Sequence, residues 1–222
     1  MKLPVIDSNG SQLREIDAAD DVFAIEPNAG VVHQAYVMHM ANRRAGSAHT
    51  LRRGEVAGSS GKTRRQKGLG RSRQGSIRAP HRVGGGSAKG PKPRSFAKRM
   101  PRQMRRLAIR SALSNHAGGG TLSVVDGIIP GEAKTRNVKA SLDALGADRR
   151  VLLVSGEHDE TLQRAARNLD FVTVMPAANL NVVDLVNAHR LVMTEDAVRV
   201  AESLWGGEHQ RPARGGVAKE AS

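Results

Sequence analysis

Residues 151–176 read VLLVSGEHDETLQRAARNLDFVTVMP, and this stretch decides the class of fold. The aliphatic run at residues 151–154 is typical of a strand that is buried on both faces. A helix is predicted at residues 160–168, and a second apolar strand at residues 171–175. Short apolar strands that alternate with helices predict right-handed βαβ units. We therefore expect an α/β fold with a mainly parallel sheet and flanking helices.

The same alternation extends in both directions along the chain. Further strands are predicted at residues 3–7, 12–16, 122–125 and 191–193, with a Ser8–Gly10 turn between the first two. Further helices are predicted at residues 28–42, 101–116, 134–145, 182–188 and 195–204. Asn28 and Thr194 are expected N-caps. For the helix at residues 101–116, Pro101 suits the first turn, and Gly118 to Gly120 should end the helix. These elements predict one globular domain from residues 1–42 and 101–205, followed by a flexible tail at 206–222.

Charge is distributed very unevenly along the 222 residues. The whole chain has a formal net charge of +14. Residues 43–110 contain 21 of the 35 Lys and Arg residues and one acid, Glu55, so this window carries +20 and the remainder −6. The sequence therefore predicts an acidic domain with a very basic insertion. Such a charge excess indicates a polyanionic partner, and nucleic acid is the usual one.

Residues 43–100, which we call the arm, show no helical or strand-like apolar periodicity before Arg99. The basic window contains 11 of the 24 Gly residues, and Phe96 is its only aromatic residue. Gly68, Gly70 and Gly84 to Gly86 lack the strand–turn–helix context of a dinucleotide site, and we expect them to let the backbone turn tightly and approach RNA closely. Such a segment buries too little apolar surface to offset its ordering entropy by itself. Two legs of roughly 28 residues could reach about 95 Å from a body whose radius of gyration is near 15 Å. We therefore expect an extended arm that folds against its partner.

Several classes of protein do not fit this composition. The chain has no Cys, so disulfides and thiolate metal sites are excluded. The eight His residues show no metal-ligand spacing, and we expect neither a metal nor another cofactor. No apolar run approaches the roughly 20 residues that span a bilayer, and residues 1–7 lack the apolar core of a secretory signal. With 2% aromatic residues, stacking on bases cannot be the main mode of binding.

Two motifs could indicate an enzyme. Gly61-Lys62-Thr63 resembles the end of a phosphate loop, but Val56 stands where that motif needs Gly, and no strand or helix flanks it. Glu157, His158 and Asp159 follow a strand, where α/β enzymes often place catalytic groups. The alternative is that Asp159 caps a helix and its neighbours are solvated, and we favour it. An α/β enzyme with a basic substrate-guiding loop and a regulatory mRNA or DNA binder remain competing hypotheses, although no recognition helix is visible.

The arm also resembles a known family. Residues 53–62 and 65–80 are similar to bacterial large-subunit ribosomal protein four. The resemblance continues at residues 84–86, 90–94, 105–114, 153–157, 165–169 and 192–198, and it runs from about residue 5 to 205. The motif in the arm is long and specific.

The resemblance implies a structural, non-enzymatic constituent of the large ribosomal subunit in the cytoplasm. The family's globular domain lies near the outer surface of the subunit and binds large-subunit rRNA early in assembly. Its extended loop runs through rRNA and helps to line the nascent-peptide exit tunnel, beside a second tunnel-lining protein. Some members repress their own ribosomal-protein operon, which adds their own mRNA as a candidate partner. No cofactor and no membrane are implied.

The expected rRNA contacts are the cations of the arm and of the helix that follows it. They are Arg43, Arg44, Arg52, Arg53, Lys62, Arg64, Arg65, Lys67, Arg71, Arg73, Arg78, Arg82, Lys92, Arg94, Arg102, Arg105, Arg106 and Arg110. The expected tunnel-facing tip is Gly61, Lys62, Thr63 and Arg64. The family often has Pro-Trp where this chain has Thr63-Arg64, so a guanidinium, which can also stack, replaces an aromatic ring. Changes at the loop tip can alter macrolide sensitivity in the family.

We expect the backbone amides of residues 43–100 to exchange with solvent at near-random-coil rates in the free protein. The reason is that the ordering entropy of the arm is offset only when RNA neutralises its charge. Native-state hydrogen exchange by mass spectrometry measures this directly, with residues 151–176 as the protected internal reference. Strong protection of the arm in the absence of RNA would contradict folding on the partner.

Overall fold

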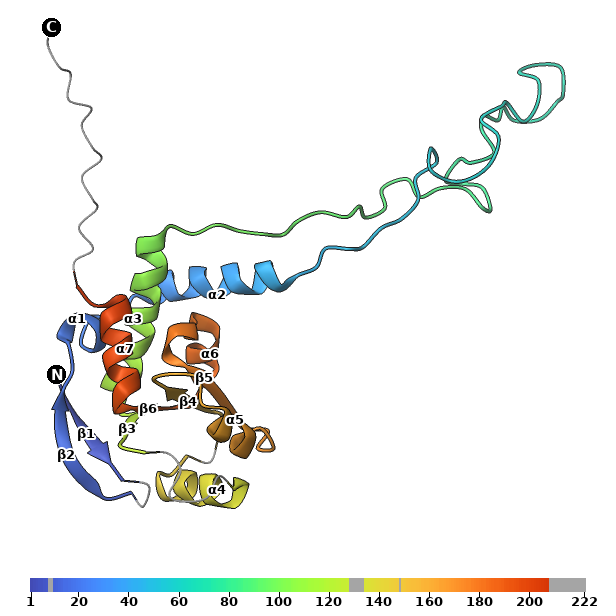
Figure 1. Ribbon diagram of the computed structural model, residues 1–222. Coiled ribbons are helices and arrows are strands. Elements are labelled where there is room, and N and C mark those ends of the chain that lie inside the picture. The colour runs from blue at the N-terminus through green and yellow to red at the C-terminus, as the bar shows by residue number, and fades with distance from the viewer. Residues whose placement is uncertain (8–9, 128–133, 148, 208–222) are drawn as a thin grey trace, which may run out of the picture. The chain divides into compact units, whose positions relative to one another are not determined.

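The computed structural model describes residues 1–7, 10–127, 134–147 and 149–207. The chain separates into two compact units, the described residues of Met1–His39 with Arg99–Ser222, and Met40–Lys98 (Figure 1). Ser8 and Asn9 of the expected turn lie outside the described residues, as does the expected tail from residue 208 onward. We call the first unit the body. The second unit lies within the arm except for three residues at its start.

The body is built on one six-stranded sheet with the strand order β2-β1-β3-β6-β4-β5. Its strands are β1 (Lys2–Ile6), β2 (Gln12–Asp17), β3 (Leu122–Val125), β4 (Val151–Ser155), β5 (Val172–Pro176) and β6 (Arg190–Thr194). Only the β1–β2 hairpin is antiparallel, and every other neighbouring pair is parallel. The predicted α/β fold with a mainly parallel sheet is therefore confirmed.

The helices follow the predicted alternation. They are α1 (Asp20–Phe23), α2 (Ala29–Arg43), α3 (Arg102–Gly118), α4 (Thr135–Ala144), α5 (Glu160–Ala166), the 3₁₀ turn η1 (Ala177–Asn179), α6 (Val182–Asn187) and α7 (Glu195–Trp205). The short elements α1 and η1 were not predicted, because one turn of helix has no periodicity to detect. Pro101 has extended ψ and is the N-cap of α3 rather than part of its first turn, and α3 continues to Gly118.

Alternate residues of the central strands enter two separate cores. Leu152 and Val154 of β4 face a core formed with α1, α3, α6 and α7. Val151 and Leu153 of the same strand face a second core formed with α4 and α5. Successive strand side chains point to opposite faces, so the continuous apolar run fills both cores at once. The result is a sheet between two layers of helices (Figure 1).

Helical spacing predicts that α3 presents an apolar-to-small stripe formed by Met104, Leu107, Ala108, Ser111 and Ala112. The helix buries a partly different face. Ala108, Ser111 and Ala112 of that stripe are buried, whereas Met104 and Leu107 are only half-buried. Leu113, which lies outside the stripe, is fully buried in the first core. The buried face of α3 is therefore displaced toward the C-terminal half of the helix.

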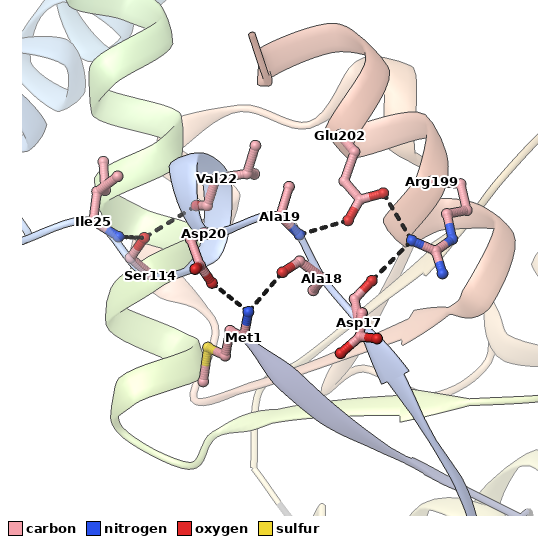
Figure 2. Close-up of polar contacts among 10 residues, drawn as sticks. All are labelled: Met1, Asp17, Ala18, Ala19, Asp20, Val22, Ile25, Ser114, Arg199 and Glu202. Atoms are coloured by element: carbon pink, nitrogen blue, oxygen red, sulfur yellow. Dashed lines mark hydrogen bonds and ion pairs between the residues drawn. The ribbon is translucent and has the colours of Figure 1, made fainter.

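Polar contacts attach the N-terminal segment to α3 and α7 (Figure 2). The backbone N–H of Ala19 donates to the Glu202 carboxylate at 2.8 Å. The buried Ser114 hydroxyl accepts from the Ile25 N–H at 3.2 Å and donates to the Val22 carbonyl at 3.0 Å. These side chains satisfy backbone groups around α1 that the short helix leaves unpaired.

Asp159 begins α5 as its N-cap, which confirms the interpretation of this residue as structural. Its carboxylate accepts hydrogen bonds from the N–H groups of Thr161 and Leu162, at 2.9 and 3.1 Å, and from the Thr161 hydroxyl at 2.6 Å. The hydroxyl bond and the Leu162 N–H hold the pKa of Asp159 below its usual range, against a smaller opposing effect of desolvation. Asn181 and Thr194 cap α6 and α7 in the same way.

Replacing Asp159 by Ala should lower the free energy of unfolding at neutral pH by about 0.5–1 kcal/mol, since an N-cap is removed. The folded-state pKa is lowered, so the carboxylate stabilises the fold fully above the unfolded Asp value of about 3.9. That stabilisation disappears as the pH falls through the lower folded-state pKa. The stability difference between wild type and variant, measured by urea unfolding, should therefore be full near neutrality and shrink below about pH 4.

The matched control is Asp170→Ala, because Asp170 is also an exposed aspartate but has no hydrogen bond among the described residues. Its effect should stay within about 0.5 kcal/mol at every pH. Equal losses of stability in the two variants, or a difference for Asp159→Ala that does not depend on pH, would contradict the capping role.

Candidate nucleic-acid interface

The arm runs out and back as two antiparallel legs (Figure 1). Backbone hydrogen bonds join the legs at the pairs Arg94–Gly46, Ser87–Leu51 and Thr50–Pro91, at 3.1, 2.8 and 3.0 Å. At the root of the arm, the Asn42 side chain accepts from the Lys98 N–H at 2.7 Å and donates to the Lys98 carbonyl at 3.3 Å. The legs are therefore held together by scattered backbone contacts rather than by a regular ladder.

Glycine makes two close approaches between the legs possible. A Cβ atom at Gly86 would lie 2.2 Å from the backbone nitrogen of Arg53. Gly46 has a positive φ of 69°, and a Cβ atom there would lie 2.1 Å from the Arg94 carbonyl oxygen. No other residue would fit at either position without moving backbone. At these positions the glycines bring the two legs of the arm together, whereas from the sequence we expected Gly86 to permit close approach to RNA and made no prediction for Gly46.

Glu55, the single acid of the arm, makes contacts within the arm. Its carboxylate pairs with Lys92 and accepts a hydrogen bond from the Arg52 N–H at 2.9 Å. The hydrogen bond from Lys92 and that from Arg52 lower the pKa of Glu55. Lys92, an expected rRNA contact, is thus half-buried in an ion pair that crosses from one leg to the other.

Phe96 forms a second crossing between the legs. The guanidinium groups of Arg44 and Arg94 lie over its ring, 3.9 and 4.4 Å from the ring centroid. Cation–π contacts place the two like charges on one aromatic ring without pairing either with an acid. Both side chains remain exposed, so their hydrogen-bond donors are still available to phosphate.

The far end of the arm is a loop closed by Lys62 and Ser76, which form an isolated bridge. The Thr63 hydroxyl donates to the Gly75 carbonyl at 2.8 Å. Gly61, Lys62 and Thr63 of the expected tip therefore lie in the paired base of this loop, and Arg64 begins the loop itself. Residues 64–74 form what we call the terminal loop. No helix follows Lys62 anywhere in residues 63–98, so the Gly61-Lys62-Thr63 motif does not have the geometry of a phosphate loop.

Some expected contact residues have partners within the arm. The Lys62 ammonium donates to Gln66. Arg78 donates to the Val56 carbonyl at 3.0 Å, and Arg82 donates to Gln74 at 3.1 Å. The side chains of the remaining expected arm residues have no acceptor among the described residues; they are Arg43, Arg52, Arg53, Arg64, Arg65, Lys67, Arg71 and Arg73. The unit Met40–Lys98 has 16 Lys and Arg residues against one Glu, so its positive charge is almost entirely unneutralised.

Within the body, the basic face of α3 is divided in the same way. Arg102 and Arg105 are exposed and Arg106 is half-buried, and none of the three side chains has an acceptor among the described residues. Arg110 instead donates to the Asp21 carbonyl at 3.4 Å, and its buried Nε has no acceptor in that part of the chain. Arg110 therefore contributes to the packing of α1 on α3 as well as to the charge of this face.

A hollow of about 250 Å³ lies beside this face of α3. Its lining residues are Ala35, His39, Arg102, Arg105, Arg106, Ile109, Leu180, Asn181, Val182 and Trp205. His39, Asn181 and Trp205 were not among the predicted site residues, because they are far from the arginines in sequence and share no spacing with them. Trp205 is the only Trp of the chain, and this was the single feature of the sequence that could have marked it as a site residue.

The remaining enzyme candidate is not supported. Asp159 is occupied as a helix cap, and the Ser155 hydroxyl donates to the Glu157 carbonyl at 2.6 Å. In the part of the chain that the structure describes, no three His, Asp or Glu side chains gather closely enough to hold a metal ion. Among the same residues, no helix is both long and apolar enough to cross a membrane.

Comparisons with known proteins agree with this geometry. The family model described as "Ribosomal protein L4/L1 family" matches residues 16–204. The chain is 43% identical to a protein of Dehalococcoides mccartyi over an alignment of 206 residues. That alignment covers 93% of this chain and 98% of the relative. The chain is 45% identical over 202 residues to a protein of Lactobacillus acidophilus and 41% identical over 203 residues to one of Brevibacillus brevis, each covering 91% of this chain and 98% of the relative.

All three relatives are named large ribosomal subunit protein uL4. The family match spans the arm and strands β3 to β6 of the sheet, so it does not depend on the charge of the arm alone. The chain therefore belongs to the ribosomal protein L4/L1 family, whose members are structural proteins rather than enzymes.

Proposed function

We propose that this chain, a structural constituent of the large ribosomal subunit, binds large-subunit rRNA through the phosphate-directed cations of its arm and of α3. It would act in the cytoplasmic ribosome and bind early in assembly. Its arm would contribute to the wall of the nascent-peptide exit tunnel, beside a second tunnel-lining protein. Family membership supports the ribosomal part of this proposal, and the arrangement of the cations supports the RNA part.

The observation that carries the proposal is the set of eight arm cations without acceptors. Lys and Arg supply most of the phosphate contacts in nucleic-acid complexes, and Arg can donate two parallel hydrogen bonds to one phosphate. A segment with 16 cations and one acid repels itself unless a polyanion neutralises it. The contacts through Glu55 and Phe96 use few of these cations, so most of them remain available.

The arm should gain most of its order from rRNA. Its internal contacts are scattered backbone and side-chain hydrogen bonds, one ion pair and two cation–π contacts. These hold the two legs in register and bury little apolar surface. Coupling the ordering of the arm to RNA binding would link its final conformation to assembly.

The terminal loop is the proposed tunnel-facing part of the arm. Thr63 and Arg64 stand where the family often has Pro-Trp, and the structure pairs Thr63 with Gly75. We extend the expected tip, Gly61 to Arg64, to the whole terminal loop, because residues 61–63 lie at its base. A regulatory interaction with the protein's own mRNA would use the same cations, and it is supported by the family resemblance alone.

Deleting residues 46–97 should weaken binding to large-subunit rRNA and flatten its salt dependence. Each bound phosphate releases counterions, so the slope of log K against log salt should fall by about 0.7–0.9 for each phosphate that the variant no longer binds. Filter binding or fluorescence anisotropy at several salt concentrations measures both quantities. If slope and affinity survive the deletion, the body makes the main contacts and the arm assignment is wrong.

A matched pair of variants refines this test. Arg71→Gln with Arg73→Gln removes two exposed arm cations, and Arg136→Gln with Arg164→Gln removes two exposed cations of α4 and α5. The first pair should reduce the slope by about 1.4–1.8, and the second should leave it unchanged. Equal slopes for both pairs would mean that net charge, rather than binding by the arm, sets the affinity.

The proposed tunnel position predicts proximity between the terminal loop and a nascent chain. The protein has no Cys, so Arg64→Cys introduces a unique thiol in that loop. Ribosomes that carry this variant and a stalled nascent chain with a thiol-reactive group should form a cross-linked product. Ala140→Cys on α4, an exposed position of the body, is the control and should not cross-link. Cross-linking of neither thiol, or of both, would contradict the tunnel assignment.

A further inference from the structure

The hollow beside α3 has a composition that differs from the rest of the basic surface. Three arginines of α3 and His39 of α2 are among its lining residues. Ile109, Leu180, Val182 and Trp205 line it as well. A hollow that is lined by both guanidinium groups and apolar side chains, and by no carboxylate, fits a ligand that has an anionic group and a flat apolar group.

The cationic part is free to bind. Arg102, Arg105 and Arg106 have no acceptor among the described residues. The acid nearest in sequence to Asn181 and Val182 of the lining is Asp184, whose carboxylate accepts a hydrogen bond from the Asn181 side-chain amide at 2.5 Å. That carboxylate does not line the hollow. The guanidinium donors therefore present positive charge that the body itself does not neutralise.

The apolar part contains an unused donor. Trp205 is 8% exposed and packs in the core that α3 and α7 share. Its indole N–H donates to no acceptor within the described residues and is not among their buried unpaired polar atoms, so it is accessible to a ligand. A Trp that lines a hollow in this way offers a ligand both a ring face or edge and a hydrogen-bond donor.

We infer that this hollow receives one unpaired nucleotide of the bound RNA, with its phosphate on the arginines of α3 and its base against Trp205 and Ile109. Single-stranded nucleotides of RNA are recognised in this manner, through extruded bases that contact aromatic side chains and guanidinium planes. The volume of about 250 Å³ lies below the range of about 300–1,000 Å³ for pockets that enclose larger ligands. It therefore suits one nucleotide rather than a run of stacked bases.

This inference rests on the proposed function but is tested apart from it. It places a base-contacting site on the body, whereas the proposed function needs only phosphate contacts. The ligand class is a nucleoside monophosphate unit. A site for inorganic phosphate would use the same arginines but would leave the apolar residues of the hollow without a contact. A nucleotide site and a phosphate site are therefore distinguished by whether the base contributes to binding.

The single Trp provides the measurement. Its fluorescence in the full-length protein is followed while AMP, GMP, CMP or UMP is added, with excitation at the red edge of the indole band, where the bases do not absorb. Ribose 5-phosphate and inorganic phosphate are titrated in parallel. N-acetyltryptophanamide corrects for collisional quenching. Because Trp205 is the only Trp, nucleotides that bind the arm do not contribute to the signal.

We expect at least one nucleotide to change Trp205 emission saturably, and ribose 5-phosphate and phosphate to have little effect. Arg102→Gln with Arg105→Gln should weaken this binding by about tenfold or more, because charge-assisted hydrogen bonds to phosphate are removed. Arg136→Gln with Arg164→Gln, a matched pair outside the hollow, should bind nucleotides as the wild type does. Circular dichroism establishes that each variant is folded.

Three results would overturn the inference. They are a native emission spectrum that no nucleotide changes, equal responses to nucleotides and inorganic phosphate, and equal losses of affinity in the two pairs of variants. If the α3 variant does not fold, the ranking of ligands on the wild type decides alone. None of these results would affect the salt dependence of rRNA binding by the arm, so failure here leaves the proposed function standing.

Discussion

The burial of β4 and β6 on both faces is the constraint on which the rest of the body depends. Leu191 and Met193 enter one core while Val192, between them, enters the other. A strand with apolar side chains on both faces cannot be exposed to water on either face, so helices must cover both faces of the sheet. This requirement sets the βαβ connections and leaves only β2 and β5 as edges. The arm is inserted between α2 and α3, outside the sheet, where a long insertion costs little additional loop-closure entropy.

Positive charge is divided between holding the arm together and binding its partner. Lys92, Arg44 and Arg94 join the two legs through Glu55 and Phe96, so they contribute to the shape of the arm. The cations of the terminal loop and of the first leg make few such contacts. In such an arm a few cations determine which residues of the two legs face each other, while most of the charge stays available for phosphate.

Sequence reasoning succeeded where one local pattern decides the outcome. The strands at residues 122–125 and 151–154 follow from aliphatic runs. The caps at Asn28, Asp159 and Thr194 follow from short side chains that accept backbone N–H bonds. It missed α1 and η1, which are too short to show a period, and the full burial of Leu113. It also treated all eighteen cations alike, because the partners of Arg78 and Arg110 are backbone carbonyls that are distant in sequence, which no local pattern reveals.

The sequence by itself determined the class of fold, the location of the arm and the sign of its partner's charge. Apolar periodicity and net charge are properties of contiguous residues, so they can be read along the chain. Only the tertiary structure decided the strand order, the role of Gly46 and Gly86 in joining the legs, and the hollow that brings His39, Arg105 and Trp205 together. Those features depend on contacts between residues far apart in the chain, and no pattern of neighbouring residues specifies them.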